Sequence, residues 1–186
     1  MEKNVTDLIQ GCRKMDSHCQ RKLFELFLPY VTSICKRYLR DKSLLKDVVQ
    51  EVFLLIFKGL NHSFDEKKGD FKGWVRKIAI NSSLKFNKRY QNFVELDTNI
   101  ETEKYQIIAN AIHNISKEEI LQLINTIPIT YRDVFNLHAI DGYSHAEIAI
   151  ILEISIESSR KKLQRARAYL KKNIESGKNI NLIKTG

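Results

Sequence analysis

Residues 141–167, DGYSHAEIAIILEISIESSRKKLQRAR, constrain the fold more than any other part of this chain. Ser144 and Glu147 have the S-x-x-E spacing of a capping box, in which each side chain satisfies a free backbone amide at the start of a helix. Residues 153–155 follow as a short turn, and Ser155 can cap a second helix. The stretch therefore predicts a helix-turn-helix.

The second helix of this motif, residues 156–172, is strongly basic. A narrow inner stripe of apolar residues recurs along it at helical spacing: Ile156, Leu163, Ala166 and Leu170. The remaining positions carry seven cations with no acid between them: Arg160, Lys161, Lys162, Arg165, Arg167, Lys171 and Lys172. A solvated basic face is the plain alternative. The capping box, the turn and the stripe together favour a helix that enters the major groove of duplex DNA.

Apolar residues follow helical spacing through almost the whole chain of 186 residues. Two prolines, seven glycines and 43% hydrophobic residues support helices packed around compact cores. Asp141-Gly142 can also mark a hairpin turn, but the alternation beside it is too brief for strands, and a glycine at a helix C-terminus fits better. We therefore expect an all-α fold.

An acidic segment divides the chain. Residues 93–103 contain four acids and no basic residue, which favours a linker, although a merely soluble connector is the simpler explanation of the composition. We expect two small helical domains joined by this acidic linker, the C-terminal one a helix-turn-helix. Their expected limits are 1–92 for the N-terminal domain, 93–115 for the linker, 116–174 for the C-terminal domain and 175–186 for a frayed tail.

The net charge of +9 and the pI near 9.4 favour a polyanionic partner, either nucleic acid or an anionic membrane surface. The start of the chain lacks the apolar core of a signal peptide, and its longest apolar runs are too short to cross a bilayer. We expect a cytoplasmic protein without membrane insertion.

Three cysteines, Cys12, Cys19 and Cys35, form no C-x-x-C pair, so neither a disulfide framework nor a zinc site is expected. We interpret them as reduced residues that mostly pack in the core. His18 beside Cys19 hints at a metal pair, but no convergent partners accompany it. The sequence therefore predicts no bound metal and no cofactor.

The first half of the chain contains several amphipathic segments, among them residues 17–28 and 30–40, which Pro29 separates or kinks. A central helix over residues 43–60 is expected to bury one side: Leu45, Val48, Val49, Val52 and Ile56. Its other side carries mostly polar residues: Asp47, Gln50, Glu51, Leu54 and Lys58. An exposed leucine among carboxylates suggests a docking surface, and an ordinary charged face carries equal weight.

A polar loop, residues 61–70, precedes a helix that Asp70 can cap. Its core candidates are Trp74, Val75, Ile78, Ala79 and Phe86. Around them lie six cations with no acid, which form a second basic surface: Lys72, Arg76, Lys77, Lys85, Lys88 and Arg89. Aromatic residues here can stack on unpaired bases. Phe64 in the polar loop is the better candidate for this, because Trp74 is expected in the core.

Three motifs, found in this order, resemble the bacterial RNA polymerase sigma factors of the small extracytoplasmic-function (ECF) group. DVVQEVF at residues 47–53 is similar to the polymerase-binding helix of that family. FKGWVRKIAINSSLKFNKR at residues 71–89 is similar to its promoter-melting helix. IP at residues 127–128, with YRDVFNL and GYSHAEIA after it, is similar to its fourth conserved region. The resemblance covers nearly the whole chain.

The resemblance implies a sigma factor that binds core RNA polymerase, through the β′ clamp helices and the β subunit, and directs promoter binding, promoter opening and transcription initiation. It implies four polymerase-binding residues: Asp47, Gln50, Glu51 and Leu54. Promoter DNA is the second implied partner. An anti-sigma factor is the third, and it is expected from the resemblance alone.

The same resemblance implies where the promoter is bound. Residues 61–70 would form a pocket for a base flipped out of the minus-ten element. The implied minus-ten contacts are Phe64, Lys72, Arg76, Lys77, Asn81, Lys88 and Arg89. The second helix of the helix-turn-helix would read the minus-thirty-five element through Ser158, Arg160, Lys161 and Arg165.

The chain departs from the family pattern within each motif. On the docking helix, Leu45 and Lys46 stand where the family has a small residue and an acid, so docking has one carboxylate fewer. Two polar residues replace aliphatic ones on the later helices, Asn87 for a leucine and Ser159 for a valine. Glu153 replaces the common turn glycine, so a less tight turn is expected.

Binding energy rather than covalent chemistry would open the duplex, so we expect no enzyme and no catalytic residue. The chief alternative is a helix-turn-helix regulator of another kind, whose first half senses a ligand or dimerises. The second basic surface, at residues 72–89, argues against it.

A nucleic-acid enzyme is a third class, but the chain has no P-loop and no H-E-x-x-H motif. Asp47 and Glu51 share a helix face, and without further ligands this pair fits docking better than metal binding.

Overall fold

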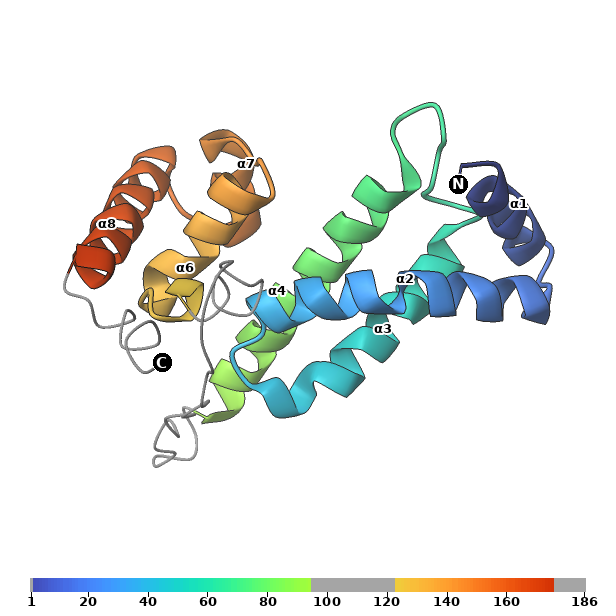
Figure 1. Ribbon diagram of the computed structural model, residues 1–186, viewed down its shortest axis with the longest axis horizontal. Helices are drawn as coiled ribbons and strands as arrows, with labels where there is room; N and C mark the ends of the chain where they lie inside the picture. Colours follow the sequence, from blue (N-terminus) through green and yellow to red (C-terminus); the bar gives the residue numbers. More distant parts are fainter. Residues whose placement is uncertain (1, 95–122, 176–186) are drawn as a thin grey trace, which may run out of the picture. The chain divides into compact units, whose positions relative to one another are not determined.

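The computed structural model describes residues 2–94 and 123–175, which fall into two compact units, residues 1–100 and 101–186 (Figure 1). The described residues form helices and no strand, which confirms the expected all-α fold. Nearly all of the expected acidic linker, the start of the expected C-terminal domain at residue 116 and the expected tail lie outside these residues. No described helix is both long and apolar enough to cross a membrane.

The N-terminal unit consists of α1 (Glu2–Arg13), α2 (Ser17–Tyr38), the 3₁₀ turn η1 (Lys42–Leu44), α3 (Leu45–Gly59) and α4 (Phe71–Val94). α2 packs against α1, α3 and α4, and α3 packs against α4 (Figure 1). Side chains from three of these helices are completely buried where they meet: Val31, Cys35, Val48, Val52, Val75, Ala79 and Ile80. The central helix therefore buries the side that its apolar spacing predicts, except at Leu45, which is half-buried at the start of the helix.

Pro29 lies inside α2, so the two amphipathic segments expected on either side of it are one helix. A proline removes one backbone donor from a helix, but the apolar residues around it compensate. Phe27, Val31 and Ile34 are all buried and continue one face past Pro29. Burial of that face therefore overrides the local break.

Aspartates fix where α2 and α4 begin. The Asp16 carboxylate accepts hydrogen bonds from the backbone N–H groups of His18 (2.8 Å) and Cys19 (3.2 Å), and these bonds lower the pKa of Asp16. Asp70 caps α4 as expected, with its Oδ1 accepting from the N–H of Gly73 at 2.5 Å. The cap on α4 fixes the point at which the polar loop before it ends.

Polar side chains are buried on α4 at positions that sequence reasoning assigned to neither core nor surface. Asn87 is 5% exposed, and its Nδ2 donates to the Tyr38 carbonyl at 2.9 Å while its Oδ1 accepts from the Arg40 N–H at 3.1 Å. These bonds satisfy backbone groups in the last residue of α2 and just after it, which explains how an asparagine replaces an aliphatic residue here.

The C-terminal unit consists of α6 (Ile129–Phe135), the π-helical turn η2 (Asn136–Ile140), α7 (His145–Leu152) and α8 (Ile156–Glu175). α8 packs against α6 and α7. The core is made by buried residues from every segment: Ile124, Ile127, Val134, Leu137, Ile148, Leu163 and Ala166. Gly142 follows η2 with φ of 78°, as expected for a glycine that ends a helical segment.

The helix-turn-helix has the predicted local chemistry. Ser144 Oγ accepts from the Glu147 N–H at 3.2 Å, and the Glu147 carboxylate accepts from the Ser144 N–H at 2.9 Å, which completes the capping box. Ser155 Oγ accepts from the Ser158 N–H at 3.0 Å and caps α8. Glu153, which replaces the turn glycine, has the left-handed φ and ψ of 54° and 47°. Glu153 therefore adopts the left-handed backbone conformation that a glycine would take in this turn.

The inner stripe of α8 differs from the prediction at its first position. Leu163 and Ala166 are buried and Leu170 is half-buried, but Ile156 is 44% exposed because it lies at the very start of the helix. Ser159, one turn before Leu163, is completely buried instead. Its hydroxyl lies 2.9 Å from Nδ1 of His145 on α7, so the helix contact begins with a polar pair.

Candidate nucleic-acid interface

The side of α3 opposite its core is mostly polar, as predicted, and it also exposes two leucines. Asp47 and Gln50 are exposed, Glu51 is half-buried, and the Leu54 residue is 49% exposed. Leu55, which sequence reasoning did not single out, is also 40% exposed. An exposed leucine pair beside two carboxylates is the composition of a surface that binds another protein.

An apolar groove of about 710 Å³ runs between α2 and α3. Phe24 and Leu28 line it from α2, and Phe53 lines it from α3, with the Phe24 and Phe53 ring centroids 4.5 Å apart. Gln50 and Leu54 are also lining residues. Two of the four residues implied in polymerase binding therefore border a hollow that the sequence did not reveal, because its walls are about thirty positions apart.

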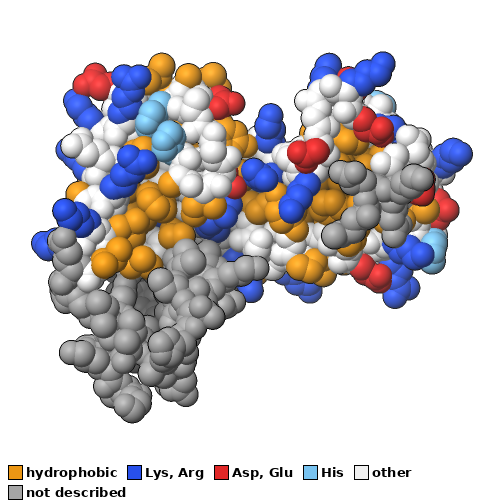
Figure 2. All heavy atoms as spheres, turned by 45° about the horizontal axis from the view of Figure 1, so that its top comes forward, with side chains coloured by type: hydrophobic (Ala, Val, Ile, Leu, Met, Phe, Trp, Pro, Cys, Tyr) orange, Lys and Arg blue, Asp and Glu red, His pale blue; other side chains and the backbone are white. Residues whose placement is uncertain are grey.

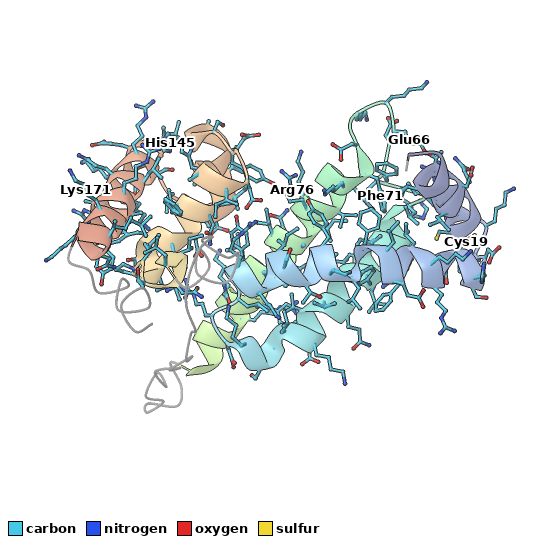
Figure 3. All side chains as sticks on the ribbon, viewed as in Figure 1. Cys19, Glu66, Phe71, Arg76, His145 and Lys171 are labelled. Atoms are coloured by element: carbon cyan, nitrogen blue, oxygen red, sulfur yellow. The ribbon has the colours of Figure 1, made fainter. Side chains whose placement is uncertain are left out.

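The cations of α4 form an exposed basic face that is tied to α2 at one point. Lys72, Lys77, Asn81, Lys88 and Arg89 are exposed, whereas Arg76 is half-buried. Nε of Arg76 donates to the hydroxyl of Tyr30 on α2 at 3.0 Å. Nζ of Lys72 lies 5.0 Å from the centroid of the same ring, within reach of a cation–π contact. Figure 3 shows Arg76 on α4.

Phe64 is buried rather than free to stack. It is 7% exposed, and its ring centroid lies 5.1 Å from that of Phe71 and 5.2 Å from that of Trp74. The polar residues around it in the sequence gave no sign of this cluster, which forms when the loop folds back on the start of α4. Phe64 therefore anchors the loop in this conformation, and the sequence-based interpretation of a free ring is corrected.

Three of the four residues on α8 that were expected to contact DNA line a groove of about 230 Å³: Ser158, Lys161 and Arg165. Arg160, Lys161 and Arg165 are exposed, and Ser158 is half-buried at the groove. Figure 2 shows Lys and Arg side chains gathered on the α8 side of this unit. The exposed cations make α8 a surface for a polyanion, as the sequence predicted.

Two of these cations have partners within the unit. Nζ of Lys161 lies 2.6 Å from Oε1 of Glu157, one turn earlier on α8. Arg165 lies over the ring of Tyr131 from α6, with Cζ 5.8 Å from the ring centroid and Nη1 3.5 Å from the hydroxyl oxygen. Tyr131 is a member of the groove that sequence reasoning missed, because it lies on another helix.

Two histidines stack at the junction of η2, α7 and α8. The rings of His138 and His145 are 4.5 Å apart and 13° from parallel. Nδ1 of His138 lies 2.8 Å from the Tyr143 carbonyl oxygen. Burial lowers the pKa of His145, and His138, Arg160 and Arg167 lower it further. The uncharged ring that results can pack against its neighbour without repulsion.

The cysteines pack as expected. Burial raises the pKa of Cys12 and of Cys35 to about 11, with Cys19 and Asp16 adding to the effect at Cys12. Both thiols are therefore protonated at neutral pH. Within the described ranges, no group of three or more His, Cys, Asp or Glu side chains is placed to hold a metal ion.

Two known protein families match separate parts of the chain. Residues 23–92 match the Sigma-70 region 2 family, and residues 117–170 match the family described as Sigma-70, region 4. These two segments cover well over half of the chain, in the order that the motifs predict.

Curated relatives match over nearly the full length. The chain is 27% identical to the ECF RNA polymerase sigma-E factor of Escherichia coli strain K12, over 94% of this chain and 97% of the relative. It is 23% identical to the ECF RNA polymerase sigma factor SigM of Bacillus subtilis, over 85% and 96% of the two chains. A solved structure of the sigma factor RpoE of Bartonella quintana, in complex with the anti-sigma factor NepR, has a TM-score of 0.60 at 17% identity, over 83% of this chain and 96% of that one. Taken with the helix-turn-helix and the two basic helices, these matches show that the chain belongs to the ECF-type sigma factors, which direct promoter-specific initiation by RNA polymerase.

Proposed function

We propose that this sigma factor docks on core RNA polymerase through α3, holds the opened minus-ten strand on α4 and reads the minus-thirty-five element with α8. The observation that carries the proposal is the presence of one exposed basic helix in each unit, α4 and α8. Two such faces on one chain suit two separate promoter elements.

Docking on polymerase is supported by the groove between α2 and α3. Asp47 and Glu51 supply charge for the basic side chains of a partner, while Leu54 and the groove supply apolar area. Protein interfaces combine an apolar centre with a polar border in this way. The β′ clamp helices of the polymerase are the proposed occupant of this face, and the β subunit is the proposed second contact.

Strand holding is supported by the way α4 presents its cations. Lys72 and Arg76 converge on Tyr30, which fixes two positive groups one helical turn apart. The other proposed contacts lie exposed along the same helix: Lys77, Asn81, Lys88 and Arg89. A row of cations of this kind follows a phosphate backbone without reading bases. Base selection at the minus-ten element is left to the loop at residues 61–70, which Phe64 anchors.

Duplex reading is supported by the residues at the start of α8. Ser158 and Lys161 border the groove and can reach base edges, whereas Arg160 and Arg165 supply phosphate contacts that fix the register. We propose that no covalent step is involved and that binding energy opens the duplex. The chain would then act in the cytoplasm, where the polymerase is.

An anti-sigma factor is the proposed regulator, because the similar Bartonella structure holds one. The apolar groove beside α3 is the surface that such a protein would have to cover in order to compete with polymerase. Competition for one surface would make inhibition and docking mutually exclusive.

The direct test is reconstituted transcription. The chain is mixed with core polymerase and fragmented DNA from the genome that encodes it, and the 5′ ends of the transcripts are sequenced. We expect starts that share two upstream elements and that are absent with core polymerase alone. No initiation, together with tight binding of the chain alone to specific DNA, would contradict the proposal and favour a polymerase-independent regulator.

A further inference from the structure

Helix α1 ends in a side chain that reaches the loop between α3 and α4. Arg13, the last residue of α1, donates from Nε to the Leu60 carbonyl at 3.1 Å and from Nη2 to the Phe64 carbonyl at 3.3 Å. Its Nη1 lies 3.5 Å from Oε1 of Glu66. Figure 3 shows Glu66 in the loop beside α1. One guanidinium thus contacts the loop at three positions.

The chemistry of these acceptors suits arginine. Leu60 is the C-cap residue directly after α3, so its carbonyl lies at the negative end of the helix dipole, where a cation is favourable. Cζ of Arg13 also lies 5.9 Å from the centroid of the Phe64 ring. A guanidinium presents five N–H donors in a fixed planar fork, whereas a lysine presents one compact charge. Only the fork can hold all these groups in one geometry.

The rest of the loop is fixed by its own chain. The Gly59 carbonyl accepts from the N–H groups of Ser63 (2.9 Å) and Phe64 (3.0 Å), and Asp65 Oδ1 accepts from the Lys67 N–H at 3.0 Å. Arg13 adds hydrogen bonds from outside the loop. Several side chains of the loop remain exposed to solvent: Asn61, His62, Asp65, Lys67 and Lys68.

Resting on the minus-ten role proposed above, we propose that Arg13 is a positioning residue that sets the base preference of the loop at residues 61–70. It fixes the carbonyls on both sides of the loop's first half, and through them the direction in which the exposed side chains point. The match to Sigma-70 region 2 begins at residue 23, so α1 contributes this control from outside the matched segment.

The test measures base preference in the assembled complex. Holoenzyme made with the natural chain selects from a promoter library randomised over both elements. Binding is then measured on the selected promoter, on its single-base minus-ten variants and on unrelated duplex. For Arg13→Ala, discrimination among the minus-ten variants should fall about tenfold, within the range that one good set of base contacts provides. Affinity for unrelated duplex should stay unchanged, which a general loss of structure would not allow.

Three further variants keep the test decisive. Arg13→Lys keeps the charge without the fork and should lose most of the discrimination. Glu66→Gln removes only the ion pair and should lose little. Arg21→Ala is the matched control, because Arg21 is exposed on α2 and pairs with Glu25 one turn away. Thermal unfolding shows which variants fold. If Arg13→Ala does not fold, Arg13→Lys decides.

The possible results distinguish the positioning role of Arg13 from the minus-ten role proposed for the loop. Full discrimination by a folded Arg13→Ala, or by Arg13→Lys where the alanine variant is unfolded, overturns the positioning role and leaves the minus-ten assignment standing. No minus-ten preference in the natural holoenzyme overturns the minus-ten assignment itself.

Discussion

The two basic helices, α4 and α8, support their cations in the same way but are anchored to their units differently. Each has a tyrosine from a neighbouring helix beside an arginine, Tyr30 for Arg76 at 3.0 Å and Tyr131 for Arg165 at 3.5 Å. The anchors are unlike. Asn87 of α4 bonds two backbone groups at the end of α2, the Tyr38 carbonyl and the Arg40 N–H, whereas Ser159 of α8 bonds one histidine ring.

This difference separates a fixed helix from an adjustable one. Backbone groups at the end of α2 cannot move without disturbing that helix, so the Asn87 bonds hold α4 in place. A serine and a histidine can change rotamer or protonation state, so the polar contact at the start of α8 responds to conditions, while Leu163 and Ala166 bury the rest of the helix in the core and Asn173 Nδ2 donates to Thr126 Oγ1 at 2.9 Å. A rigid support suits the holding of an opened strand, and an adjustable helix suits the reading of a duplex whose shape varies.

The largest effect should come from exchanging the two buried polar residues for the family's aliphatic ones. Asn87→Leu should lower the free energy of unfolding of the N-terminal unit by about 2–3 kcal/mol, because buried backbone groups lose a partner. Ser159→Val should cost less than about 1 kcal/mol, because one side-chain bond is replaced by apolar contact. Denaturant titration followed by Trp74 fluorescence measures the cost of Asn87→Leu. Amide exchange in α7 and α8 measures the cost of Ser159→Val. Equal costs would remove the proposed difference in anchoring.

The next effect is on duplex binding by α8. Arg165→Ala should weaken binding to every DNA sequence about tenfold and reduce the salt dependence of affinity by about one ion. Lys161→Ala and Ser158→Ala should instead change the preference among minus-thirty-five variants. Holoenzyme binding at several salt concentrations measures both. Equal weakening of every promoter by all three changes would show that this helix does not read bases.

A smaller effect should distinguish the two supporting tyrosines. Tyr30→Phe should lower affinity for single-stranded minus-ten DNA about threefold, the size expected from one hydrogen bond that orients Arg76. Tyr131→Phe should change duplex affinity by less than about twofold, because its bond at 3.5 Å is at the weak limit. Fluorescence anisotropy of labelled DNA bound to holoenzyme measures both. The reverse order would mean that the two tyrosines are not comparable supports.

The smallest effect is a dependence on pH confined to the C-terminal unit. The pKa of His145 is lowered by folding, so the unfolded chain takes up a proton more readily as pH falls. Stability from the neutral ring is therefore complete above the ordinary value of 6.5 and is lost as pH falls below it. Amide exchange in α7, corrected for its intrinsic rate, should rise toward pH 5 in the natural chain. His145→Gln should flatten this change, and an unchanged profile would contradict it.

The sequence predicted what depends on local chemistry. The capping box at Ser144 and Glu147, the cap at Asp70 and the two-sided central helix all follow from spacing over one or two turns, and the structure has each of them. The less tight turn expected from Glu153 is wrong, because Glu153 adopts the left-handed conformation that the family's glycine would have.

The misses share one physical cause, which is contact between distant parts of the chain. Phe64 has polar neighbours in the sequence, but in the structure its ring packs on residues of the next helix. Pro29 favours a helix break by its local propensity, but α2 continues past it because the apolar face on both sides of it is buried. Arg13 drew no attention because its acceptors are 47 to 53 positions away.

The central claim is that α3 docks on core RNA polymerase, and co-elution tests it most directly. The purified chain is mixed with core polymerase and passed through a sizing column, beside the variant Asp47→Lys, Glu51→Lys and the control Arg165→Ala, which changes only α8. We expect the natural chain and the control to co-elute with polymerase and the double variant not to. Co-elution of the double variant at the same level as the natural chain would contradict the proposed docking face.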